Sequence, residues 1–160
     1  MTRTRAMAVG LGALLLLIQL RQPDRTNPPV DPAAVIDRHV PVPADVAAIL
    51  ARSCRDCHTN ETRWPLYSYV APISWLVASH VQHGREHMNF SEWSSNDPES
   101  MQDLLEEICQ EAREGMMPLP SYTIIHRSAR LAPDEVSRLC AWTAEAIAAI
   151  DGRLAPAGSQ

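Results

Sequence analysis

Cys54-Arg55-Asp56-Cys57-His58 is the stretch that decides how this 160-residue chain is expected to fold. Two cysteines three positions apart can add to the two vinyl groups of one haem, and a histidine directly after them is held beneath the iron as its proximal ligand. A Cys-x-x-Cys pair alone would fit a thiol-disulfide motif or half of a zinc site equally well. The adjacent His58 favours one covalent haem c, attached through thioether bonds from Cys54 and Cys57.

A zinc site is the alternative interpretation of the same residues. It would combine Cys54 and Cys57 with another pair such as His83 and His87, which stand four apart on a predicted helix. The export machinery that attaches haem recognises this same pentapeptide, so we expect haem rather than zinc.

Apolar residues on both sides of the motif recur at helical spacing in four segments. The segments begin at Pro43, after Pro72, at Asn96 or Asp97 and at Pro133, and the last two end at Gly115 and Gly152. The stripe of the second segment consists of Ile73, Leu76, Val77, His80, Val81 and Gly84. With six glycines and no strand-like alternation, a β sandwich is not expected. We predict an all-α fold, a small cytochrome c-like domain of residues 44–152 around one haem.

The second axial ligand of the iron must come from another part of the chain, and methionine sulfur or histidine nitrogen would serve. Met117 is the preferred candidate, because it follows a helix that ends at Gly115 and precedes Pro118, which restricts the backbone. A thioether opposite His58 would raise the reduction potential of the iron. Met116 and His80 are the alternatives, and both methionines could instead be ordinary core residues.

Aromatic residues cluster after the motif and could line the cofactor pocket. Trp64, Tyr67 and Trp75 are the candidates for contact with the porphyrin ring. Arg85 could pair with a haem propionate, as could Arg63.

The two remaining cysteines, Cys109 and Cys140, lie on the inward stripes of the third and fourth helices. In an oxidising compartment they could form a disulfide across a helix pair. Two buried free thiols are the alternative, because the sequence does not show how closely their Cβ atoms approach.

The N-terminal residues 1–21 are expected to be a signal anchor, or a signal peptide. The apolar stretch from Ala6 to Leu20 would reach only about 22 Å as a helix, short of the ~30 Å hydrocarbon core. Arg3 and Arg5 precede it and would stay in the cytoplasm, which predicts a protein at the periplasmic face of the inner membrane, or a soluble periplasmic protein if the segment is cleaved.

Six prolines lie between Arg21 and Pro43, so residues 22–43 are expected to form a semi-rigid tether between membrane and domain. A strap packed along the domain is the alternative. Residues 153–160 are expected to be a flexible tail.

From residue 22 onward the chain has eleven arginines, no lysine and nineteen acidic residues, a formal charge of −8. Nucleic-acid binding normally needs a basic surface, so this function is not expected. The charge favours partner proteins with positive docking surfaces.

Several segments in order along residues 45–145 make the chain similar to the small c-type haem-binding domain (Haem_bd) proteins of bacteria. They are Cys54 to Asn60, Trp64 to Ser68, Ala71-Pro72, Ser74 to Leu76, His80-Val81, Gly84-Arg85, Asn89 to Ser91 with Trp93, Met117 to Leu119, Tyr122 and His126. This resemblance implies one covalently bound haem in an exported and often membrane-tethered domain.

Together these features predict an electron carrier rather than an enzyme, passing single electrons between periplasmic or membrane redox partners. One alternative is a haem peroxidase or gas sensor, in which Met117 is absent from the iron or leaves it easily. Another is a structural haem subunit of a larger membrane complex.

Overall fold

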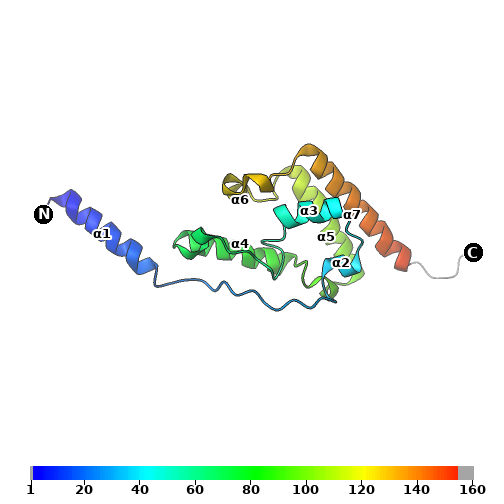
Figure 1. The fold of residues 1–160 in the computed structure, drawn as a ribbon, viewed down its shortest axis with the longest axis horizontal. Helices are drawn as coiled ribbons and strands as arrows, with labels where there is room; N and C mark the ends of the chain where they lie inside the picture. Colours follow the sequence, from blue (N-terminus) through cyan, green and yellow to red (C-terminus); the bar gives the residue numbers. More distant parts are fainter. Residues whose placement is uncertain (1, 155–160) are drawn as a thin grey trace, which may run out of the picture.

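The computed structural model describes residues 2–154, and within them all regular structure is helical (Figure 1). This confirms the all-α prediction for the described part of the chain; residues 155–160 of the predicted tail lie outside it. The α-helices are α1 (Arg3–Ile18), α2 (Ile36–His39), α3 (Ala44–Ser53), α4 (Ile73–His87), α5 (Pro98–Glu114), α6 (Pro120–Ile125) and α7 (Pro133–Leu154). Three short 3-10 helices are η1 (Leu66–Tyr69), η2 (Trp93–Ser95) and η3 (Arg127–Ala129).

Helix α5 begins and ends where its sequence predicts. The side chain of Asp97 caps it by accepting a hydrogen bond from the backbone N–H of Ser100 at 3.0 Å, and Pro98 occupies the first turn. Gly115 ends it with a φ of 69°, a left-handed conformation that glycine adopts without a Cβ clash.

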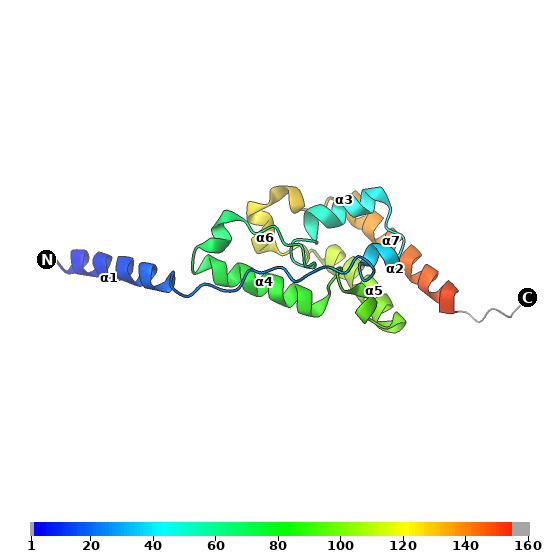
Figure 2. The same ribbon diagram turned by 60° about the horizontal axis from the view of Figure 1, so that its bottom comes forward.

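The hydrophobic core lies between α3, α5, α7 and the short α2, together with the loop that follows α4. Helices α5 and α7 run side by side along much of their length (Figures 1 and 2). The largest fully buried side chains are Trp93, Trp142, Phe90, Ile36, Leu50, Leu105 and Leu139. The indole N–H of Trp142 donates to the carbonyl of Pro41 at 2.8 Å, so this buried polar group is satisfied.

Helix α4 lies beside this core rather than within it. Only Ser74 and Val81 are buried along α4, while Ile73 and Leu76 are about half exposed. The apolar stripe expected on this helix is present, but it faces a cleft instead of the core.

Residues 22–35 form a strap that runs along α4, an arrangement visible in both views (Figures 1 and 2). The Asn27 amide donates to the carbonyl of Thr62 at 3.0 Å, and the N–H of Ile36 donates to the carbonyl of Phe90 at 2.8 Å. Ile36 itself is completely buried. Residues 22–35 thus have the arrangement weighed as the alternative to a free tether, a strap whose polar groups bond to the domain.

Helix α1 projects from the end of the domain where α4 begins (Figure 1). None of its described residues is buried. An N-terminal membrane helix was expected, but over residues 2–154 no helix combines the length and the apolar character needed to cross a membrane.

Candidate cofactor site

The Cys-x-x-Cys-His segment forms a tight loop at the end of α3. The backbone N–H groups of Cys57 and His58 both donate to the carbonyl of Cys54, each at 3.1 Å. The hydroxyl of Thr59 closes the loop by donating to the carbonyl of Arg55 at 2.7 Å. Both cysteines and the histidine line the same cleft.

The cleft has two adjoining hollows, of about 440 Å³ and about 170 Å³. Cys54, His58, Met117 and Pro118 contribute to both, so the motif stands where the hollows meet. Side chains of α4, α6 and η1 wall the larger hollow, and α5 and α7 wall the smaller one. Side chains on these walls are mostly apolar, as in sites that hold a large organic cofactor.

His58 is held so that one ring nitrogen remains available. Its Nδ1 lies 3.0 Å from the carbonyl oxygen of Met88. Because a carbonyl only accepts hydrogen bonds, Nδ1 carries the proton and the lone pair is on Nε2. Burial lowers the pKa of His58, although the bond to Met88 opposes this shift. The ring is therefore a neutral imidazole, the form that binds metals.

Cys54 and Cys57 are free thiols in the structure. Burial raises the pKa of the Cys54 thiol to about 12 and that of the Cys57 thiol to about 11. Both remain protonated at neutral pH, which makes them slow nucleophiles in thiol-disulfide exchange. This environment is unlike that of a redox-active Cys-x-x-Cys pair.

The ligands that the zinc alternative needs do not lie together in the described residues. Over residues 2–154 no group of three or more histidine, cysteine, aspartate or glutamate side chains is arranged to hold a metal ion. His87 lies 2.8 Å from the carboxylate of Glu107, and His83 bonds to the carbonyl of Ser79 at 2.7 Å. Both histidines are thus hydrogen-bonded to groups other than Cys54 and Cys57.

The candidate axial ligands differ in where they lie. Met117 lines both hollows and is 37% exposed, whereas Met116 lines neither and is 56% exposed. His80 lines the larger hollow from α4. Met117 and His80 therefore share the cleft with His58, and Met116 lies outside it.

Three residues expected in the cofactor pocket hold the strap and the motif loop instead. Trp64 and Arg85 both donate to the side-chain oxygen of Asn27, at 3.3 and 2.7 Å. Trp75 donates to the carbonyl of Arg21 at 2.6 Å. Trp64 and Arg85 bond to a polar side chain of the strap and not to the cleft. No local pattern in residues 22–35 predicts that the strap packs at this place. Tyr67 does line the cleft, as expected.

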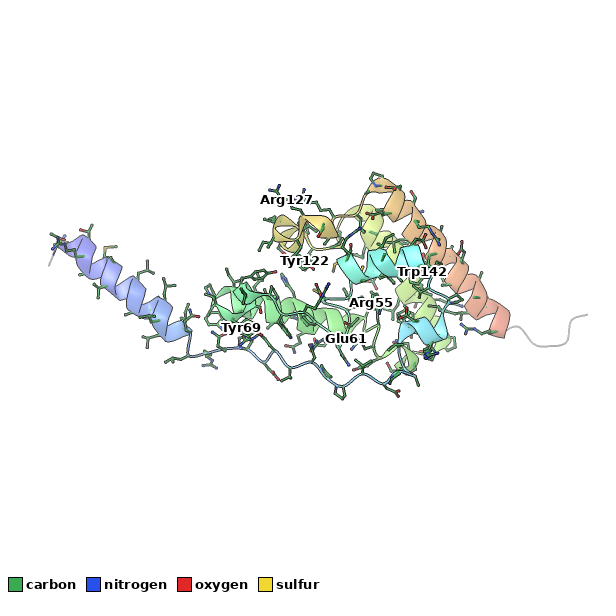
Figure 3. All side chains as sticks on the ribbon, viewed as in Figure 1. Arg55, Glu61, Tyr69, Tyr122, Arg127 and Trp142 are labelled. Carbon is green, nitrogen blue, oxygen red and sulfur yellow. A yellow bond between two sulfur atoms is a disulfide. The ribbon has the colours of Figure 1, made fainter. Side chains whose placement is uncertain are left out.

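Sequence reasoning missed a polar network on the wall of the larger hollow. The Tyr67 hydroxyl lies 2.6 Å from Nε2 of His126, whose ring stacks on Tyr122 with centroids 4.3 Å apart. The Tyr122 hydroxyl donates to Asp56 at 3.0 Å, and Arg63 pairs with the same carboxylate. In the sequence, the spacing of Tyr122 and His126 by four residues, about one helical turn, could have indicated that their rings lie together. Figure 3 shows Tyr122 on α6 directed toward α4.

Cys109 and Cys140 do not line the cleft and are joined by a disulfide with a Cα–Cα distance of 4.7 Å. The bridge links α5 to α7 at the packed side of the domain.

Two free thiols, an imidazole with its Nδ1 proton bonded and mostly apolar walls therefore meet in one cleft. Comparison with protein families supports haem binding, since the family described as "Haem-binding domain" matches residues 13–145. The match includes the strap as well as the helical domain. No match was found among curated proteins or among solved structures.

Proposed function

The chain belongs to the haem-binding domain family, and we propose that it carries one haem c, bound covalently, and transfers single electrons. Cys54 and Cys57 would hold the cofactor through thioether bonds. His58 would ligate the iron through Nε2, and Met117 would supply the opposite ligand.

The position of His58 is the observation that carries this proposal. A proximal histidine needs its second nitrogen hydrogen-bonded, because this bond fixes the tautomer and the orientation of the ring. The Met88 carbonyl supplies that bond at 3.0 Å, and burial keeps the ring neutral. An ordinary buried histidine would not need two free thiols on the same wall of an apolar cleft.

When bound, the haem supplies an iron that alternates between two oxidation states one electron apart. The chain's own contribution is to surround it. Ile73, Leu76 and Ile125 line the cleft and reduce the access of water. A thioether ligand from Met117 and apolar surroundings both favour the reduced state, which raises the reduction potential.

Electron exchange would take place with proteins that carry positive docking surfaces, since the chain beyond residue 21 has a formal charge of −8. We place this exchange at the periplasmic face of the inner membrane. Arg3 and Arg5 lie at the start of α1 and are followed by an apolar stretch, and none of the described residues of α1 is buried; these features support attachment there.

A haem enzyme or gas sensor is the second candidate, and the polar network of the cleft favours it. Tyr67 and His126 bring hydrogen-bonding groups to a wall that is otherwise apolar. Such groups could orient a small ligand if Met117 did not occupy the iron.

Absorption spectra of the matured protein, oxidised and reduced, test the proposal. We expect covalent haem in the wild type and a six-coordinate low-spin spectrum in both oxidation states. Met117→Ala should lose this axial-ligand signature, bind carbon monoxide rapidly when reduced and have a lower reduction potential. Met116→Ala is the matched control and should resemble the wild type.

Each contrary outcome has a clear meaning. A mature protein without covalent haem contradicts the proposal itself. If Met117→Ala kept the wild-type signature, His80→Ala would be the next variant, because His80 shares the cleft. Rapid carbon monoxide binding by the wild type would favour the sensor or enzyme.

A further inference from the structure

The C-terminal end of α1 is hydrogen-bonded to the domain through its C-cap residue. The side chain of Gln19 makes two hydrogen bonds to the backbone of Ala71: its amide donates to the carbonyl at 3.0 Å, and its oxygen accepts from the N–H at 2.9 Å. Trp75 donates to the carbonyl of Arg21 at 2.6 Å. The direction in which α1 leaves the domain is therefore set by side-chain contacts and not by a free linker.

The part of the domain that receives α1 has an exposed apolar corner. Leu66, Tyr69 and Val70, which we call the η1 corner, are 89%, 51% and 53% exposed. Arg25 of the strap lies over the ring of Tyr69, 4.4 Å from its centroid. Figure 3 shows Tyr69 at the end of the domain from which α1 departs. Large apolar side chains so exposed in neighbouring positions indicate a contact surface.

The η1 corner differs from the rest of the domain in its charge. No charged residue occurs from Trp64 to Ser79, and no acidic residue between Glu61 and Glu86. The adjoining segment carries Arg21, Asp24 and Arg25, a net charge of +1, and the Arg25 guanidinium lies over Tyr69. A surface of anionic lipid headgroups would repel most of this acidic domain but would accept this corner.

Helix α1 itself indicates which partner covers this end. Its apolar side chains point in all directions, and none of its described residues is buried. A helix that docks on one protein surface needs only one apolar face, whereas a helix in lipid meets an apolar solvent on every side.

We propose that the η1 corner lies in the surface of the lipid bilayer that α1 enters, so that the domain is held against the membrane in one orientation. This inference rests on the proposed membrane attachment. Tyr69 and Trp75 suit the interface, where aromatic side chains with a polar group are enriched. Ile73, the first residue of α4, lines the cleft, so this orientation puts the wall of the cofactor site next to the membrane.

Nitroxide labels on the holoprotein, in vesicles of phosphatidylcholine and phosphatidylglycerol, test the orientation. Single cysteines replace Leu66 or Val70 in the corner, Leu14 in α1, and the exposed residue Gln110 of α5 as the control. The unsubstituted protein gives the background labelling. Power saturation then compares collisions with oxygen, which concentrates in lipid, and with a water-soluble nickel chelate. We expect several-fold higher oxygen-to-nickel ratios at positions 14, 66 and 70 than at 110.

The outcomes separate the two proposals. If position 14 is in lipid while 66 and 70 match position 110, the corner does not contact the membrane, although α1 is attached. If position 14 is as accessible to the nickel chelate as position 110, the proposed membrane attachment through α1 is contradicted as well. Labels at 66 and 70 shielded from both reagents would mean a protein occupant and would overturn the lipid proposal.

The Gln19 contact provides a second, independent test. Gln19→Ala removes both hydrogen bonds to Ala71, so the label at position 66 should lose its lipid signature while the label at 14 keeps it. Gln19→Glu retains the acceptor for the Ala71 N–H and should have a smaller effect. An unchanged signal at 66 in Gln19→Ala would contradict the rigid coupling of α1 to the corner.

Discussion

Gly84 of α4 packs directly against Cys57 of the motif loop: a Cβ at position 84 would lie 2.9 Å from the Cys57 carbonyl oxygen and 3.3 Å from its Cβ. A distance of 2.9 Å is too short for a contact between a Cβ atom and a backbone carbonyl oxygen. The absence of a side chain at this point allows α4 to form the wall of the cleft next to the cysteines.

We therefore expect Gly84→Ala to displace α4 or the motif loop. Overpacking typically costs about 1–3 kcal/mol, which exceeds the gain of up to about 1 kcal/mol from replacing a helical glycine by alanine. Urea unfolding and the haem content per chain measure the effect, and both should fall. Gly152→Ala in α7 is the control, since a Cβ at position 152 would have no neighbour within 4 Å and the variant should be neutral or stabilised. Equal behaviour of the two variants would contradict the contact.

Asn27 links the strap to the motif side of the domain. Its side chain accepts hydrogen bonds from Arg85 and Trp64 and donates one to the carbonyl of Thr62. Asn27→Ala removes all three hydrogen bonds, although Arg85 keeps its bonds to Thr59 and Thr62. A donor or acceptor left without a partner costs about 1–3 kcal/mol where it is shielded from water. We expect faster amide exchange in residues 22–35. Asn27→Asp keeps the acceptor and should exchange more slowly than the alanine variant; unaltered exchange in Asn27→Ala would show that the strap is held elsewhere.

The disulfide between Cys109 and Cys140 closes a loop with a sequence separation of 31 residues. On the chain-entropy model such a loop stabilises the folded state by about 3–4 kcal/mol. We expect a reductant to lower the urea midpoint of the wild type by a corresponding amount. The double variant Cys109→Ser/Cys140→Ser should start at this lower midpoint and be insensitive to reductant. Its haem content should be normal, because neither cysteine lines the cleft; a loss of haem would contradict this separation.

Glu135, in the first turn of α7, contributes to stability in a pH-dependent way. The N–H of Ala132 at 2.9 Å and then the guanidinium of Arg52 at 2.8 Å hold the pKa of Glu135 below its usual value near 4.5. A carboxylate with a lowered pKa stabilises the fold above its unfolded-state pKa, and this contribution is lost as the pH falls through the folded-state value. Glu135→Gln should thus be less stable than the wild type by about 0.2–1 kcal/mol at neutral pH.

At acidic pH the wild type and Glu135→Gln should converge, because protonation removes the same charge. Urea unfolding at a series of pH values measures this convergence. Glu106→Gln, at an exposed position of α5, is the control and should follow the wild type throughout. A constant difference between wild type and Glu135→Gln at all pH values would contradict the role of its charge.

The sequence alone determined the features that depend on neighbours along the chain. The cysteine spacing and the adjacent His58 indicated the cofactor, and capping by Asp97 and the stop at Gly115 predicted the ends of α5. The apolar stripe of α4 was also predicted correctly, since helical periodicity is a local property. The four-residue spacing of Tyr122 and His126 was visible too, but its meaning depends on Asp56 and Tyr67, which are distant in the sequence.

Only the tertiary structure decided what these surfaces contact. The stripe of α4 faces a cleft because α2, α3, α5 and α7 already complete the core without it. Trp64 and Arg85 bind Asn27 of the strap because residues 22–35 return along α4, and Trp75 binds the carbonyl of Arg21, which precedes the strap. Proline-rich composition does not distinguish a packed strap from a free tether. A hydrogen bond such as that between Asn27 and Arg85 joins residues 58 positions apart. Such contacts depend on the packing of the whole domain, and no local pattern in the sequence encodes them.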